Sequence, residues 1–154
     1  MHPFSVLVVD DEEDFVWATV KRLVKRGVKA EGLLSGEKVL ELIKKKRFDV
    51  ILLDIKMPGG MDGIETLREI KKISPLTEVI LLTGHASVES SIDGMKLGAF
   101  DYLLKPVKLE ALIAKLAEAF EKKAQTGQKI QSANIQSLFK VPERGTGQGK
   151  DEEK

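Results

Sequence analysis

Charged residues stand directly after three short apolar runs of this chain. The run over residues 6–9 ends at Asp10 and Asp11, the run over 50–53 at Asp54, and the run over 100–104 at Lys105. Short apolar runs that alternate with helix-length segments are typical of a parallel sheet, whose strands end at one common edge where ligands bind. Three carboxylates and one amine are therefore expected to meet there and to form a site for a divalent cation and a phosphate group.

Each of these residues also has an ordinary structural interpretation. Asp10 and Asp11 could simply begin a helix, since acidic side chains favour helix N-termini, and Asp54 could cap a turn. Lys105 could be a surface lysine, and Thr83, which ends another apolar run, could be an ordinary strand-end residue rather than a hydroxyl for a bound phosphate. The combination favours a function, because neighbouring carboxylates repel one another unless a cation joins them.

The composition is that of a globular protein with one domain and a proper core. The chain has 154 residues, 42% of them hydrophobic and 32% charged, and a net charge of +1 that favours neither nucleic acid nor an anionic membrane. It contains no cysteine, which excludes disulfides and thiolate metal sites. No segment resembles a signal peptide or a membrane span, so a cytoplasmic location is expected.

Five strands and five helices are predicted, in alternation. The strands are expected at residues 4–9, 28–34, 49–53, 78–82 and 100–104, and the helices at about 14–26, 36–46, 62–73, 86–96 and 107–124. Right-handed crossovers then give an α/β fold with a doubly wound parallel sheet and helices on both faces.

Apolar spacing predicts which side of each helix faces the sheet, and glycine and serine predict helix ends. Gly27 is placed to end the first helix and Ser35 to cap the second. Val16, Val20, Leu23 and Val24 form the apolar stripe of the first helix, and Val88, Ile92 and Met95 share one face of the fourth.

The chain changes character after the last predicted helix. Residues 1–124 form the predicted domain, and residues 125–154 are rich in glycine and charge and are expected to be a flexible or partly helical tail. Four apolar residues in this tail could form a weak helix: Ile130, Ile135, Leu138 and Phe139.

Five ordered motifs resemble the receiver domain of two-component response regulators. They are Asp10-Asp11, Leu53–Pro58, Met61–Gly63, Leu82–His85 and Gly98–Pro106, and the resemblance covers residues 4 to about 122. The last two motifs are similar to receivers of the nitrogen-regulation type, and the architecture to single-domain, chemotaxis-type receivers. The resemblance implies five parallel strands in the flavodoxin-like order 2-1-3-4-5.

The resemblance also implies a chemistry for the charged residues. Asp54 would be the phosphoacceptor and would receive its phosphoryl group from a sensor histidine kinase or a histidine phosphotransfer protein. Asp11 and Asp54 would bind Mg²⁺ together with the backbone carbonyl of Lys56, and Asp10 would assist through water. Thr83 and Lys105 would receive the phosphoryl oxygens, which fits a reaction that depends on positioning and on neutralisation of charge.

Further residues take expected roles around this centre. Tyr102 would move inward when Thr83 shifts, and the bond before Pro106 is expected to be cis. Lys56 and His85 would flank the phosphoryl group, and because neither is acidic we hypothesise a long-lived phosphorylated form; both could instead simply point into solvent.

Two surfaces are expected to meet partners. Phe15 and Ala18 lie opposite the apolar stripe of the first helix, where a partner's phosphohistidine helix would dock, although a solvent-facing Phe can be an accident. The output would pass through the face of helix 4, strand 5 and helix 5. Helix 4 contains Gly94, which weakens a helix by ~1 kcal/mol relative to Ala.

The sequence therefore predicts a stand-alone receiver that signals by changing protein–protein binding, as a monomer or a phosphorylation-promoted dimer. It would not be a turnover enzyme, and neither direct nucleic-acid binding nor a membrane span is expected. The alternative is an interaction scaffold that keeps the fold without phosphorylation. A small phosphatase is disfavoured, because Lys56 stands where such an enzyme needs a second aspartate.

Overall fold

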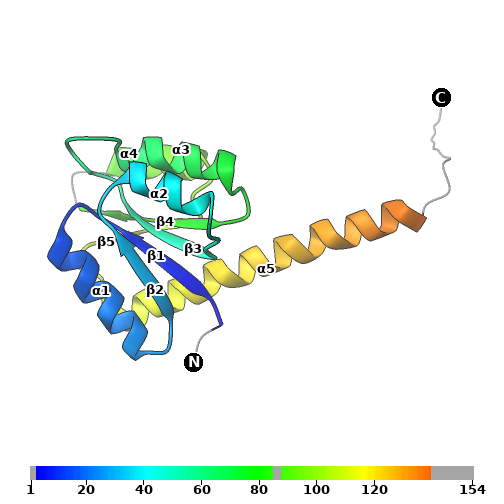
Figure 1. Ribbon diagram of the computed structural model, residues 1–154, viewed down its shortest axis with the longest axis horizontal. Coiled ribbons are helices and arrows are strands. Elements are labelled where there is room, and N and C mark those ends of the chain that lie inside the picture. Colours follow the sequence, from blue (N-terminus) through cyan, green and yellow to red (C-terminus); the bar gives the residue numbers. More distant parts are fainter. Residues whose placement is uncertain (1–2, 85–87, 140–154) are drawn as a thin grey trace. The chain divides into compact units, whose positions relative to one another are not determined.

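The computed structural model describes residues 3–84 and 88–139, except for the side chains of Val88 and of residues 128–139. Its elements alternate along the chain (Figure 1), in the order β1 (Ser5–Val9), α1 (Glu13–Lys25), β2 (Lys29–Leu33), α2 (Gly36–Ile43), β3 (Val50–Asp54), α3 (Gly63–Ile73), β4 (Glu78–Thr83), α4 (Val88–Lys96), β5 (Asp101–Leu104) and α5 (Leu109–Phe139). The five strands are parallel and lie in the order β2-β1-β3-β4-β5, which confirms the predicted fold.

Two hydrophobic cores lie on opposite faces of the sheet. Side chains alternate along a strand, so Val6 and Val8 of β1 pack into one core with α1 and α5, whereas Leu7 and Val9 pack into the other with α2 and α3. Figure 1 shows α2, α3 and α4 on one side of the sheet and α1 on the other. The central strand β3 is buried along its whole length, which explains its continuous apolar sequence.

Local polar contacts fix the ends of several helices. Gly27, with a φ of 83°, follows the last turn of α1, and the Ser35 hydroxyl accepts the Lys38 N–H at the start of α2, as predicted. At the start of α3, Asp62 accepts the Glu65 N–H while the Glu65 carboxylate accepts the Asp62 N–H, a complete capping box. This box fixes the point at which the chain leaves the loop after β3.

The apolar face of α4 does not meet the sheet. Ile92 and Met95 are 52% and 39% exposed, while Ser91 and Gly94 are buried. A Cβ built on Gly94 would lie 2.2 Å from Cδ1 of Leu81, so the helix backbone itself packs against β4. On α1, Val24 is also 53% exposed, contrary to the predicted stripe. Apolar spacing marks a face of each helix, but in α4 small residues form the side that meets the sheet.

The last helix continues beyond its predicted end near residue 124 and is assigned through Phe139. The chain divides into two units, residues 1–123 and 124–154. The sheet, both cores and every residue considered for chemistry belong to the first unit. Among the described residues, no helix combines the length and apolarity needed to cross a membrane.

Candidate functional site

The strand register brings the predicted site residues to one edge of the sheet. Val9 of β1 pairs with Leu53 of β3, so Asp10 and Asp54 follow at the same level. Thr83 ends β4 opposite Leu104 of β5, and the backbone N–H of Lys105 donates to the Thr83 carbonyl at 2.9 Å. Residues that are 95 positions apart in sequence therefore lie at one edge, as the sequence predicts.

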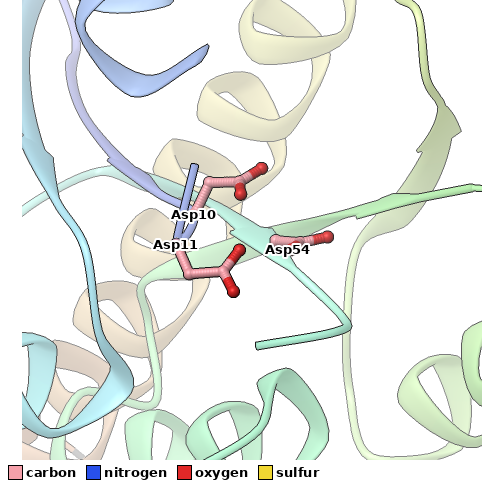
Figure 2. A group of neighbouring side chains, drawn as sticks. All are labelled: Asp10, Asp11 and Asp54. Atoms are coloured by element: carbon pink, nitrogen blue, oxygen red, sulfur yellow. The ribbon is translucent and has the colours of Figure 1, made fainter. Parts of the chain in front are cut away.

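Three carboxylates form the centre of this edge. Oxygen atoms of Asp10, Asp11 and Asp54 all lie within 4.8 Å of one another. Figure 2 shows the three side chains extending to the same side from the ends of β1 and β3. Asp10 is fully buried and Asp54 is 7% exposed, whereas Asp11 is exposed. The group thus offers oxygen ligands at an opening to solvent, a donor set that suits a hard cation such as Mg²⁺.

Lys105 supplies the positive charge of the site, and its nearest partner is Asp10. Its Nζ donates to Oδ2 of Asp10 at 2.5 Å and lies 3.7 Å from Oδ1 of Asp54. Asp10 is preferred because its carboxylate is completely buried and an unpaired buried charge is costly.

The electrostatics of Asp54 follow from this arrangement. Burial and the neighbouring charge of Asp10 raise the pKa of Asp54 to about 7, against the lowering effects of Lys105 and of a backbone hydrogen bond from Lys56. The pKa of Asp11 is also raised, by partial burial and by its hydrogen bond and charge interaction with Asp10. Ionisation of Asp11 and Asp54 is therefore disfavoured, and a bound cation would relieve the repulsion between the carboxylates.

Charge on Lys105 is favoured by its surroundings. Burial alone would lower its pKa, but the hydrogen bond to Asp10 and the charges of Asp54 and Asp10 raise the pKa above its usual value. Its Nζ also lies 4.5 Å from the ring centroid of Phe15 and 3.6 Å from Oε1 of Glu12. Lys105 is thus an ammonium held between two buried carboxylates and an aromatic face.

The remaining predicted residues lie around this centre. Thr83 is 1% exposed and its hydroxyl donates to the Gly84 carbonyl at 2.8 Å, while Tyr102 is 41% exposed on β5. The side chain of Lys56 is exposed, and the Lys105–Pro106 peptide bond is cis. His85 lies outside the described residues.

Phe15 does not face solvent as fully as expected. It is half-buried and packs against the core of α1 and α5, while Ala18 is exposed. Both border a small, mostly apolar pocket of about 90 Å³, which is lined further by Thr19, Arg22, Leu52, Leu82, Val107, Leu109 and Leu112. Its ring packs against this core and against the Lys105 ammonium, contacts that helical spacing alone does not reveal.

Two acidic residues near the site were missed in the sequence. Glu12 reaches Lys105, and only its place in the acidic run after β1 could have suggested this. Glu37 of α2 contacts the loop that follows Asp54, and no motif in the sequence connects these two segments.

Comparison with known proteins agrees with this geometry. The family model of the response regulator receiver domain matches residues 6–117. The transcriptional regulatory protein ZraR of Salmonella typhimurium is 37% identical over 132 residues, which are 84% of this chain and 29% of that protein. The DNA-binding transcriptional regulator NtrC of Escherichia coli is 37% identical over 114 residues, covering 74% of this chain and 24% of its own length.

Solved structures show the same fold. The crystal structure of a response regulator receiver domain protein from Clostridium thermocellum has a TM-score of 0.75 and 35% identity, and the match covers 80% of this chain and 98% of that one. The chain spans less than a third of the length of the two curated relatives. On the matched residues and the strand order together, this chain belongs to the family of response regulator receiver domains, the phosphoacceptor modules of two-component systems.

Proposed function

We propose that this chain accepts a phosphoryl group on Asp54 in an Mg²⁺-dependent reaction and signals by changing its binding to another protein. One observation carries the proposal: the carboxylates of Asp10, Asp11 and Asp54 converge within 4.8 Å, and the Lys105 ammonium lies between two of them. This is the set of groups that phosphoryl transfer requires, since the reaction depends on positioning and on neutralisation of charge.

Asp11 and Asp54 would hold Mg²⁺, with the backbone carbonyl of Lys56 as a further ligand and Asp10 assisting through water. When bound, the ion offsets negative charge on the phosphoryl group and on the carboxylates. It also favours ionised Asp54, whose pKa is otherwise raised to about 7 by burial and by Asp10. Ionisation matters because a carboxylate is a much stronger nucleophile than the neutral acid.

The transfer itself then follows from the positions of the side chains. An oxygen of Asp54 forms a bond to phosphorus as the P–N bond to the donor's histidine breaks, and the electron pair of that bond stays on the imidazole nitrogen. Lys105 lies 3.7 Å from Asp54 and would move from Asp10 to a phosphoryl oxygen. The Thr83 hydroxyl, which now donates to the Gly84 carbonyl, would turn to a second phosphoryl oxygen.

The phosphoryl donor we propose is a sensor histidine kinase or a histidine phosphotransfer protein in the cytoplasm. Its docking surface would include Phe15 and Ala18, which border the small apolar pocket next to Lys105. Lys56 and His85 would tune hydrolysis of the phosphorylated form. Beyond its own phosphorylation and dephosphorylation, we propose no turnover reaction and no direct nucleic-acid binding.

The output would use the face formed by α4, β5 and α5. Four apolar side chains of α4 and β5 are exposed on the described part of the chain: Ile92, Met95, Tyr102 and Leu104. A new charge of about −2 on Asp54 would draw Thr83 toward it and allow Tyr102 to turn inward, which changes this face. The target is a protein of unassigned identity or a second copy of this chain.

Labelling with a small phosphodonor tests the proposal. Incubation with phosphoramidate and Mg²⁺ is expected to add one phosphoryl group, detected by intact mass spectrometry. Chelation of Mg²⁺ with EDTA and the Asp54→Asn substitution should each abolish the gain, because one removes the cation and the other the nucleophile. Asp93→Asn, a change at an exposed aspartate of α4, serves as the matched control and should label normally.

A wild-type protein that gained no phosphoryl group under these conditions would contradict the proposal. That outcome would favour the alternative, an interaction scaffold that does not depend on phosphorylation. Normal labelling of Asp54→Asn would instead show that the acceptor is a different residue.

A further inference from the structure

Glu37 on α2 contacts the loop between β3 and α3, residues 55–62. Its Oε2 accepts the backbone N–H of Met61 at 2.9 Å. The loop also passes directly against this carboxylate at Gly60, where an added Cβ would lie 3.2 Å from Oε2. Glu37 therefore holds the loop through a hydrogen bond and a close backbone approach.

The two ends of this loop are fixed independently of Glu37. The Ile55 N–H donates to the Leu82 carbonyl at 3.0 Å, and the Gly63 N–H donates to the Ile55 carbonyl at 2.9 Å. Between these ends, residues 58–60 are exposed and Gly59 has a φ of 90°. In the described part of the chain, the bond from Met61 to Glu37 is the one side-chain hydrogen bond that reaches residues 58–61.

The first turn of α2, which contains Glu37, is tightly packed against α3. At Gly36, an added Cβ would lie 2.1 Å from Oγ1 of Thr66 on α3, so α2 and α3 meet without space for a side chain. The Ser35 hydroxyl caps the same turn. Glu37 thus connects the exposed part of the loop to a rigid contact between two helices.

The loop and Glu37 also border the acidic centre. A pocket of about 370 Å³ is lined by Asp11, Glu37, Met57 and residues 58–61 of the loop, together with Leu34 and Ser35. The hydrogen bond from Met61 lowers the pKa of Glu37, which agrees with a charged acceptor at this position. Movement of the loop would therefore change one wall of the space next to Asp11.

We propose that Glu37 is a positioning residue: by accepting the Met61 N–H it fixes residues 58–61 of the β3–α3 loop as one wall of the space next to Asp11, where Mg²⁺ would bind. The inference rests on the proposed Mg²⁺-dependent function. The hydrogen bond from Met61 to Glu37 would offset the conformational freedom that Gly59 and Gly60 give to the loop.

The first test needs no metal and no phosphodonor. Amide hydrogen exchange at Met61 is compared in the wild type, Glu37→Ala, Glu37→Gln and Glu41→Ala, where Glu41 is an exposed control on the same helix. Glu37→Ala is expected to speed exchange about tenfold, because the acceptor is lost. Glu37→Gln keeps an acceptor oxygen and should stay within about twofold of wild type, as should Glu41→Ala. If the exchange rate at Met61 were unchanged in Glu37→Ala, Glu37 would not hold the loop and the inference would be wrong.

The second test asks whether the tether shapes the space in which the metal would bind. Calorimetric titration with MgCl2 should give a dissociation constant about fivefold to tenfold higher for Glu37→Ala, because the untethered loop must be ordered again when the ion binds; the net contribution of one hydrogen bond sets the upper limit. Glu37→Gln should restore wild-type affinity, and labelling rates at limiting Mg²⁺ should follow the same order. If Gln fails like Ala, charge rather than hydrogen bonding is responsible and the inference is wrong.

Two further outcomes separate this inference from the proposed function. If Glu37→Ala loosens the loop but leaves Mg²⁺ affinity and labelling unchanged, the contact is structural only and the inference fails while the proposed function stands. If the wild type binds Mg²⁺ but is never labelled, the proposed function fails, while exchange and titration still decide the role of Glu37. Urea unfolding of each variant excludes a general loss of structure.

Discussion

At the scale of single residues, the site contains more buried negative charge than its one lysine can balance. Asp10 is fully buried and Asp54 nearly so, and both lie within reach of the Lys105 ammonium. Burial and the charge of Asp10 raise the pKa of Asp54 to about 7, and Lys105, which is closer to Asp10, only partly opposes this rise. The residue proposed to be modified is therefore the one whose charge most needs a cation.

This imbalance predicts a pH-dependent stability for the metal-free protein. Asp54 titrates near 3.8 when unfolded and at about 7 when folded, so between these values the folded protein binds the extra proton and stability falls as pH rises. Asp54→Asn imitates the neutral form and should lose this dependence. Relative to wild type, its free energy of unfolding in EDTA should rise by roughly 1–2 kcal/mol between pH 5 and pH 8, with partial exposure allowed for.

Urea unfolding at the two pH values measures this difference. Asp93→Asn is the control and should show the same pH dependence as wild type, since Asp93 is exposed on α4 and is not one of the clustered carboxylates. Saturating Mg²⁺ should raise the free energy of unfolding of the wild type more than that of Asp54→Asn, because the variant lacks one of the proposed metal ligands. A gap between Asp54→Asn and wild type that is the same at pH 5 and pH 8 would contradict the raised pKa.

The convergence of Asp10, Asp11, Asp54 and Lys105 could be predicted because it depends only on parallel strands that end at one edge. The preference of Lys105 for Asp10 could not, since it depends on which carboxylate is more completely buried. Glu37 could not be found either, because its contact joins a helix to a loop that no periodicity connects. Which side chains pair with one another can therefore be read only from the packed structure.

At the scale of elements, α4 shows how a helix can meet a sheet through small residues. The backbone at Gly94 lies against Leu81 of β4, while Ile92 and Met95 are exposed. The sequence predicted the strands well because buried apolar runs identify them directly. It did not show which face of α4 meets the sheet, because apolar residues usually mark the core side and here they form a surface that we propose for partner binding.

Replacement of Gly94 tests this packing. Alanine gains about 1 kcal/mol of helix propensity, but its Cβ would lie 2.2 Å from Cδ1 of Leu81 and overpacking costs about 1–3 kcal/mol. Gly94→Ala is therefore expected to lower the free energy of urea unfolding. Gly127→Ala is the matched control on α5, where an added Cβ meets nothing within 4 Å, and it should not lower stability. If Gly94→Ala proved as stable as wild type, close approach would not constrain α4.

At the scale of the whole molecule, the core contacts and ion pairs of the first unit, among the side chains that the structure describes, involve residues up to Lys123. The two cores extend from Phe4 to Phe120. Two ion pairs join α5 to the rest of the unit. Lys115 pairs with Asp101 of β5 at 2.8 Å, and Lys123 pairs with Asp49, just before β3, at 3.2 Å. The five-stranded order was predictable because each short strand alternates with a helix. The length of α5 was not, because glycine and polar residues after position 124 favour neither helix nor coil strongly.

Two truncations separate these contributions. A chain that ends at Ala124 keeps both cores and the ion pair at Lys123, so its thermal midpoint should stay within about 3 °C of the full chain, with unchanged phosphoramidate labelling. A chain that ends at Ala119 also loses Phe120, whose ring centroid lies 5.5 Å from that of Phe4, and should be destabilised by about 3–5 kcal/mol. Calorimetry and intact mass measure both effects. If the cut after Ala124 removed cooperative unfolding, residues beyond 124 would be part of the folded domain, and the division of the chain proposed from its sequence would be wrong.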